Sequence, residues 1–86
     1  MNEVYIIGLG NPGKKYSKNR HNIGFLVVEE LSKKNNSNFL SKDKLKSSLS
    51  EFKINDSTYR LFLPNTFMNK SGDAVRAIID WYKINL

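Results

Sequence analysis

The chain has 86 residues, of which 40% are hydrophobic and 26% charged, so it is at most one small globular domain and too apolar for a disordered chain. It has no cysteine, which excludes disulfides and thiolate metal sites, and no apolar run approaches the roughly 18 residues that span a bilayer. The N-terminus lacks the basic and apolar regions of a signal peptide, so we expect a cytoplasmic protein. The net charge of +6 leaves two interpretations, a nucleic-acid partner or a basic surface without a specific partner.

A short apolar run at residues 4–7 predicts a first strand, buried on both faces as in a parallel sheet. The next segment, GLGNPG at residues 8–13, matches the letters of a dinucleotide-binding loop. In such a loop the helix opens directly among the glycines, whereas here Pro12, Gly13 and a basic stretch precede any helical periodicity. Two other interpretations are a tight turn whose glycines allow close backbone approach and a turn that presents the amide of Asn11.

A helix is predicted from Asn22, a suitable N-cap, to the polar residues 35–38. Its apolar stripe follows the helical spacing and comprises Ile23, Leu26, Val27 and Leu31. His21, the only histidine, lies just before this helix in a polar, cationic loop. A lone histidine is commonly structural, but an imidazole with a pKa near about 6.5 in such a loop also suits a general base that activates water. No carboxylates cluster near it in the sequence, which disfavours a metal site.

Residues 41–50 are polar and lysine-rich, and we expect them to form an exposed, mobile approach to a strand. Apolar and polar residues then alternate on both sides of a turn signal at residues 55–57, which predicts a β-hairpin that stops at Pro64. A second amphipathic helix is predicted from the spacing of Val75, Ile78, Ile79 and Tyr82.

The loop at residues 64–72 leads from a strand end into this helix, a place where α/β folds hold ligands. Asn69 has the side chain needed to orient a carbonyl or stabilise an oxyanion. The alternative interpretation is that Asn69 or Ser71 caps the helix while Phe67 and Met68 pack.

The predicted order is β-α-β-β-α, part of a single-domain, three-layer α/β fold with a mixed sheet. We expect residues 1–86 to be the N-terminal part of one domain, truncated at the C-terminus. The reason is that two helices and a doubly buried strand need more sheet than three strands provide. The rest of the domain is either missing or supplied by another chain.

Three segments in this order and spacing resemble the bacterial-type peptidyl-tRNA hydrolases. They are GLGNPG at 8–13 with the nearby Tyr16, RHNIG at 20–24, and PNTFMNKSGDAV at 64–75. The resemblance runs nearly end to end. It implies a hydrolase that cleaves the ester between a peptide and the 3′-terminal ribose of tRNA. The enzymes of this family act in bacterial cytoplasm or in organelles, are usually monomers, and use neither cofactor nor metal.

The resemblance also implies roles for individual residues. His21 matches the histidine that activates the attacking water, and Asn11 matches an asparagine near the scissile ester. Asn69 matches the asparagine that positions the water or carbonyl and helps bind the peptide backbone. Residues that line the site and the channel for the 3′-adenosine or peptide are matched by Tyr16, Phe67 and Met68.

The chain departs from the family pattern in length and in one catalytic group. The family's chains are much longer, and the aspartate that orients the catalytic histidine lies in a segment that matches nothing here. Much of the family's tRNA-binding surface lies there too, and Asn19 stands where the family usually has Thr. We therefore expect these 86 residues alone to be weakly active or inactive. Two alternatives remain: a non-catalytic RNA-binding relative on the same scaffold, against which the set of His21, Asn11 and Asn69 argues, and a dinucleotide-binding module.

Overall fold

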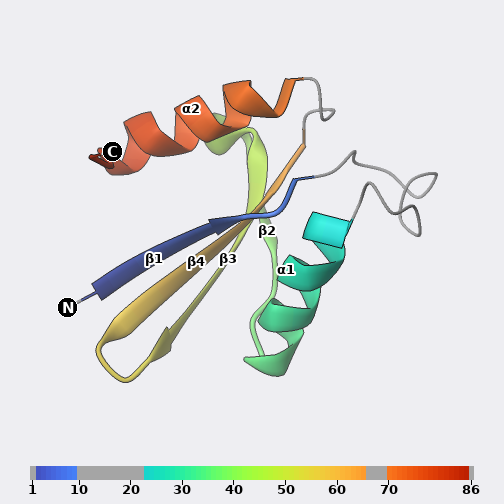
Figure 1. The fold of residues 1–86 in the computed structure, drawn as a ribbon, viewed down its shortest axis with the longest axis vertical. Helices are drawn as coiled ribbons and strands as arrows, with labels where there is room; N and C mark the ends of the chain where they lie inside the picture. Colours follow the sequence, from blue (N-terminus) through green and yellow to red (C-terminus); the bar gives the residue numbers. More distant parts are fainter. Residues whose placement is uncertain (1, 10–22, 66–69, 86) are drawn as a thin grey trace.

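The computed structural model describes residues 2–9, 23–65 and 70–85 (Figure 1). In chain order the elements are β1 (Asn2–Ile7), α1 (Ile23–Lys34), β2 (Leu40–Lys42), the 3-10 helix η3 (Asp43–Leu45), β3 (Ser47–Ile54), β4 (Ser57–Pro64) and α2 (Ser71–Tyr82). The predicted β-α-β-β-α order is confirmed, with β2 and η3 added to it.

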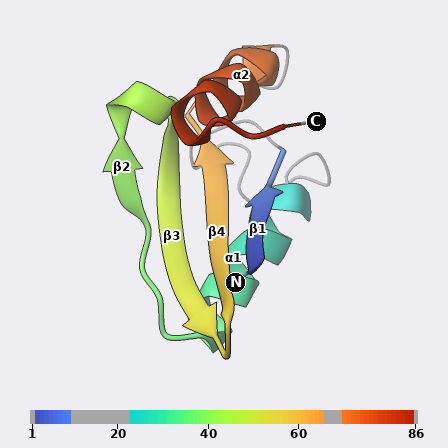
Figure 2. The same cartoon turned by 90° about the vertical axis from the view of Figure 1, so that its left-hand side faces the viewer.

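The strands form one four-stranded mixed sheet in the order β1-β4-β3-β2 (Figure 2). β1 runs parallel to β4, and the β4–β3 and β3–β2 pairs are antiparallel. Within the described residues β1 lies at an edge of the sheet, and residues 4–7 are half-buried. The predicted parallel strand is therefore confirmed, whereas its predicted burial on both faces is wrong, because residues 4–7 keep part of their surface exposed within the described residues.

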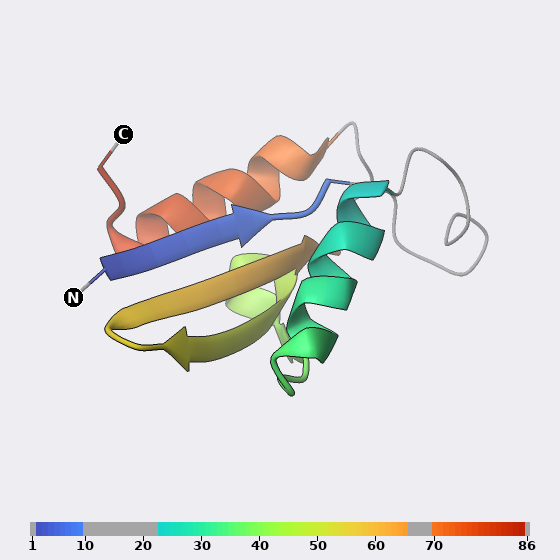
Figure 3. The same cartoon turned by 60° about the horizontal axis from the view of Figure 1, so that its bottom comes forward.

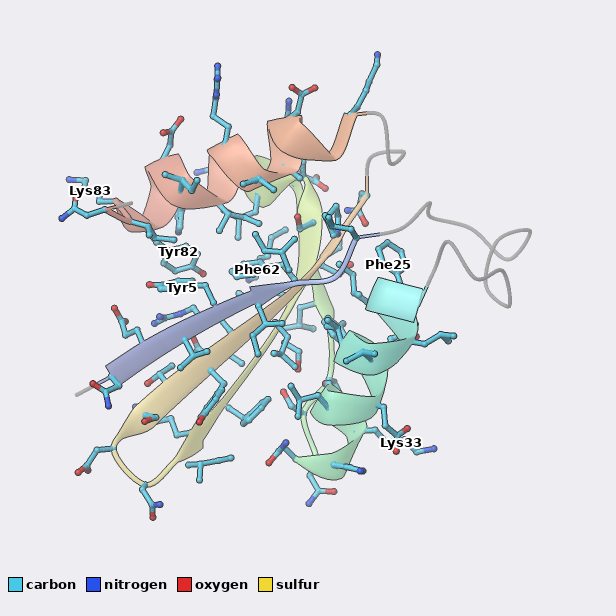
Figure 4. The ribbon with its side chains drawn as sticks, viewed as in Figure 1. Tyr5, Phe25, Lys33, Phe62, Tyr82 and Lys83 are labelled. Atoms are coloured by element: carbon cyan, nitrogen blue, oxygen red, sulfur yellow. The ribbon has the colours of Figure 1, made fainter. Side chains whose placement is uncertain are left out.

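The two helices lie on opposite faces of the sheet, which gives the predicted three layers (Figure 3). On the α2 face the register places Ile7 and Leu49 beside Phe62. The core there consists of buried Leu45, Phe62 and Ile78, against which Tyr5, Ile7, Leu49, Tyr82 and Ile84 pack. The rings of Tyr5, Phe62 and Tyr82 contact one another: the Tyr5 centroid lies 6.4 Å from Phe62 and 5.3 Å from Tyr82, and the latter two centroids are 6.0 Å apart (Figure 4). These rings fix α2 to the sheet.

The face of α1 that meets the sheet differs from the predicted stripe. Leu26 and Val27 are 48% and 59% exposed, while Val28 and Ser32 are each only 2% exposed. The buried position of Ser32 has a clear cause, because its hydroxyl lies 2.6 Å from that of Ser50 on β3 and donates a 2.8 Å hydrogen bond to a backbone carbonyl. A satisfied serine can thus take a core position that an apolar stripe would not assign to it.

The expectation that residues 41–50 form an exposed approach to a strand is confirmed at residues 41–44 and at Lys46, and it is wrong at Leu45 and residues 47–50, which are buried or half-buried. β2 pairs with β3, and the segment buries Leu45, Ser47 and Ser50. The Ser47 hydroxyl donates a 2.9 Å hydrogen bond to the carbonyl of Leu45. Lys46 adopts a left-handed conformation, with φ of 51°, and ends η3. Local side-chain hydrogen bonds therefore let this polar sequence join the sheet.

The predicted hairpin is confirmed. β3 ends at Ile54 and β4 begins at Ser57, so the connecting loop is short, and Asn55 takes a left-handed φ of 54° that asparagine tolerates. α2 also follows its predicted stripe, with Ile78 fully buried.

The residues predicted to cap α2 are not confirmed, unlike the helix itself. α2 starts at Ser71, so Ser71 is its first residue, and the N-cap is Lys70, which forms no capping side-chain hydrogen bond. The prediction that Ser71 caps α2 is therefore wrong. The other predicted caps, Asn22 and Asn69, lie outside the described residues. Neither α1 nor α2, the helices of the described ranges, has the length and apolar character needed to cross a bilayer.

Candidate functional site

The carboxyl ends of β1 and β4 lie together at the border of the sheet where these strands end. We call this border the strand-end edge, as distinct from the lateral edge formed by β1. Ile7 is paired with Phe62, and the N–H of Gly8 continues the ladder with a 2.9 Å hydrogen bond to the carbonyl of Phe62. Along the chain, the strand-end residues Leu9 and Asn65 are followed directly by residues 10–22 and 66–69. Because β1 and β4 run parallel, residues 10–22 and residues 66–69 both follow strand ends at this edge, as in other α/β folds. We call these two stretches the motif segments.

Two glycines allow the start of α1 to contact the end of β1 through backbone atoms. A Cβ placed on Gly24 would lie 2.6 Å from the carbonyl oxygen and 2.7 Å from the nitrogen of Leu9. A Cβ on Gly8 would lie 2.6 Å from the Gly24 carbonyl oxygen and 2.9 Å from Val28. The interpretation of GLGNPG as a turn that permits close backbone approach is therefore confirmed at Gly8. Gly24 was missed by sequence reasoning, although a glycine inside an apolar helix start was the available signal.

A groove of about 570 Å³ lies beside the strand-end edge, between Leu9 and the first turns of α2. Its apolar wall comes from Leu9, Val75 and Ile79, and its polar rim from Arg76 and Asp80. Leu9 is 48% exposed, so an apolar side chain faces solvent at this position. The groove has the size and character to accept an apolar portion of a ligand.

The other side of the strand-end edge is basic. The N–H of Asn65 donates a 2.8 Å hydrogen bond to the carbonyl of Lys46, which fixes the end of β4 beside η3. Lys42, Lys44 and Lys46 are all exposed, as is Lys70 ahead of α2. Cations along this border favour an anionic ligand.

An ion-pair cluster around Arg60 was missed by sequence reasoning and lies on the face of the sheet that α2 covers, beside Tyr82. Arg60 donates hydrogen bonds of 2.8 Å to Glu3 and 2.7 Å to Glu51. Its guanidinium lies 4.9 Å from the centroid of the Tyr82 ring and 5.5 Å from that of Tyr5. All of these partners belong to the fold, so the cluster stabilises the packing of α2 and is not assigned to the site.

Hydrogen bonds and burial within this cluster shift the pKa values of four of its side chains. The hydrogen bond from Arg60 lowers the pKa of the Glu3 carboxyl below its ordinary value. Burial raises the pKa of the Tyr5 and Tyr82 phenols above theirs. Desolvation acts to lower the pKa of Arg60, but the hydrogen bonds to Glu3 and Glu51 outweigh it and the pKa rises. Glu3 and Arg60 are therefore both charged at neutral pH, and the two phenols are neutral.

The side chains predicted to perform the chemistry fall outside the described residues. Asn11, Tyr16 and His21 belong to residues 10–22, and Phe67, Met68 and Asn69 to residues 66–69. The structure describes the strand ends and helix starts that flank these segments, and their predicted roles remain predictions. In the described part of the chain no three His, Cys, Asp or Glu side chains are grouped as a metal site would require.

The fold and the strand-end edge define a class: a mixed, three-layer α/β protein whose motif segments follow the ends of two parallel strands. The family model for peptidyl-tRNA hydrolase matches residues 5–86. The chain therefore belongs to the peptidyl-tRNA hydrolase family.

Individual relatives agree with this assignment. A peptidyl-tRNA hydrolase of Prochlorococcus marinus strain AS9601 is 79% identical over all 86 residues, which cover 43% of that relative. One from Synechococcus sp. strain CC9311 is 42% identical over 81 residues, which cover 94% of this chain and 39% of the relative. The crystal structure of peptidyl-tRNA hydrolase from Acinetobacter baumannii superposes with a TM-score of 0.89 at 38% identity, over 96% of this chain and 42% of that chain.

The chain thus spans less than half the length of the relatives that it matches, in agreement with the expected difference in length. The family match does not favour the dinucleotide-binding alternative.

Proposed function

We propose that this chain provides the water-activating part of a site that hydrolyses the ester between a peptide and the 3′-terminal ribose of tRNA. The observation that carries the proposal is the parallel pairing of β1 with β4, because the segments with His21 and Asn69 both continue from that edge. The net charge of +6 and the lysines beside the edge suit a tRNA backbone. The relatives named above are themselves peptidyl-tRNA hydrolases.

In the proposed reaction His21 is the general base. It takes a proton from water while the water oxygen bonds to the ester carbonyl carbon. The tetrahedral intermediate then breaks its bond to the ribose oxygen, which regains a proton, and a peptide carboxylate and a free tRNA hydroxyl result. The amide of Asn69 orients the water or stabilises the developing oxyanion, and Asn11 contacts the substrate beside the ester. The channel for the peptide or 3′-adenosine is lined by Tyr16, Phe67 and Met68.

The groove beside Leu9 supports this arrangement. It is lined by Leu9, which directly precedes residues 10–22, and by residues of α2 from Gly72 onward, which follow residues 66–69 closely in the chain. Its apolar wall suits the acyl portion of a peptidyl ester, while the lysines on the other side of the edge suit the phosphates of tRNA. The ester is then expected between an apolar and a cationic surface.

The test uses residues 1–86 joined to the part of the Prochlorococcus marinus AS9601 relative that this chain does not cover. Release of a labelled N-acyl-aminoacyl group from tRNA is measured for this protein and for His21→Ala. General-base catalysis contributes about 10²–10⁴-fold, so His21→Ala is expected to lower kcat by that factor. Lys33→Ala, an exposed lysine of α1, is the matched control and is expected to leave kcat unchanged.

Two results separate the proposal from its alternative. Retention of most activity by His21→Ala would refute the role given to this residue. Binding of tRNA without hydrolysis by the joined protein would instead identify a non-catalytic RNA-binding relative. For the 86-residue chain alone we expect weak turnover or none.

A further inference from the structure

A second cavity, of about 440 Å³, lies between η3 and the last turn of α2, on the face of the sheet that α2 covers. It is lined by an apolar floor of Leu45, Leu49 and Tyr82, a wall formed by Trp81, and a rim that includes Lys42 and Lys44. The groups proposed to perform the hydrolysis include none of these side chains, although the two rim lysines belong to the basic border of the strand-end edge. The size is ample for one planar heterocycle.

The wall of this cavity is an exposed indole. Trp81, the only tryptophan of the chain, is 54% exposed. The ammonium of Lys44 lies 5.3 Å from the centroid of its ring. A cation–π contact at an exposed position is weak, so a ligand ring can displace the ammonium from the indole face at little cost. An exposed aromatic ring, once the ammonium has moved aside, is the kind of surface on which nucleobases stack.

The rim of the cavity carries excess positive charge. The segment SKDKLK at residues 41–46 places Lys42, Lys44 and Lys46 around one aspartate, Asp43, and all four side chains are exposed. The same segment reaches the strand-end edge, because the carbonyl of Lys46 accepts the hydrogen bond from the N–H of Asn65. A polyanion bound at that edge can therefore continue along η3 to the cavity.

We propose that this cavity is a secondary RNA contact, in which an unpaired base stacks on Trp81 while Lys42 and Lys44 bind the adjacent phosphates. The apolar floor favours a base over a free phosphate, and the lysines favour a nucleotide over an uncharged aromatic ligand. The inference rests on the proposed function for the identity of the polyanion as RNA. Binding at Trp81 is nevertheless measurable without catalysis.

The test is a titration of the tryptophan fluorescence of the 86-residue chain, excited at a wavelength that its four tyrosines do not absorb, so that Trp81 alone reports. The probe is a single-stranded oligoadenylate of about six nucleotides, enough for one stacked base with flanking phosphates. We expect saturable quenching by this probe and none by inorganic polyphosphate of equal charge. The double variant Lys42→Ala/Lys44→Ala is expected to raise Kd at least about tenfold and to flatten its salt dependence. Lys33→Ala, on the opposite face of the sheet, is the matched control and is expected to keep the wild-type Kd (Figure 4).

A second readout follows the stacking directly. Anisotropy of the end-labelled oligonucleotide is expected to show about 5- to 150-fold weaker binding by Trp81→Ala, with most of the affinity restored in Trp81→Phe. Equal quenching by polyphosphate, equal loss in Lys33→Ala and the lysine double variant, or unchanged binding by Trp81→Ala would each overturn the proposal. His21→Ala separates the two proposals, because it is expected to bind the oligonucleotide normally. Retained hydrolysis by the joined His21→Ala protein would refute the proposed function and spare this inference, whereas unchanged oligonucleotide binding by Trp81→Ala would refute this inference and spare the proposed function.

Discussion

Gly24→Ala tests whether the start of α1 is fixed to the end of β1 by direct backbone contact. The added methyl group would lie 2.6 and 2.7 Å from two backbone atoms of Leu9, and neither atom can move without shifting the strand end. Overpacking of this kind typically costs about 1–3 kcal/mol. Alanine in place of a helical glycine returns at most about 1 kcal/mol. These two effects leave a net loss of about 0–3 kcal/mol in the free energy of unfolding.

Gly72→Ala is the matched control, because Gly24 and Gly72 are each the second residue of a twelve-residue helix. A Cβ on Gly72 meets nothing within 4 Å, so this change is expected to stabilise the chain by about 0.5–1 kcal/mol through helix propensity alone. The two variants are compared by urea and thermal unfolding, where each kcal/mol moves the Tm by about 4–8 °C in a domain of this size. If Gly24→Ala were as stable as Gly72→Ala, the close contact would not exist and the reasoning would be refuted.

Two further predictions concern the two faces of the sheet. The lowered pKa of Glu3 means that its pairing with Arg60 stabilises the fold above the ordinary glutamate value of 4.5 and is lost as the pH falls through the lowered pKa. Glu3→Gln is therefore expected to unfold more easily than wild type at pH near 6, by a difference that shrinks as the pH falls below 4.5, as measured by urea midpoints; a difference that does not change with pH would contradict this. Ser50→Ala removes a buried hydroxyl that lies 2.6 Å from that of Ser32, and we expect a loss of about 1–2 kcal/mol in unfolding free energy, against no measurable loss for the exposed Ser41→Ala.

The strands and helices with strong local signals could be predicted from the sequence. The run at residues 4–7 indicated β1, and the turn at Asn55 indicated the hairpin, because each signal depends only on neighbouring residues. The second helix was predicted with its correct face, since its apolar residues repeat at the helical period and Ile78 is buried.

The features that were missed depend on residues far apart in the chain. Ser32 faces the sheet because Ser50, 18 residues away, bonds to its hydroxyl, and no periodicity rule assigns a serine to the core. Arg60 joins Glu3, 57 residues away, for a similar reason.

The strand β2 was missed for a local reason. Its three residues are all exposed and show no alternation of apolar and polar side chains.

The candidate site could be predicted only as a set of motifs. The sequence identified the segments with Asn11, His21 and Asn69, and the structure adds that the strand ends from which these segments continue lie at one edge. The contact between Gly8 and Gly24 could not be derived from periodicity, because it requires knowing that α1 packs back onto the end of β1.

The most direct test of the central claim, that His21 and Asn69 act together at the strand-end edge, is a double-mutant cycle on kcat/KM. It is measured on the joined protein with N-acyl-aminoacyl-tRNA, using His21→Ala, Asn69→Ala and both together. If the two side chains serve one reaction centre, the double variant is expected to be little worse than His21→Ala alone, because residues that act as a unit are strongly non-additive. Losses that multiply in full, or an active His21→Ala/Asn69→Ala protein, would contradict the account.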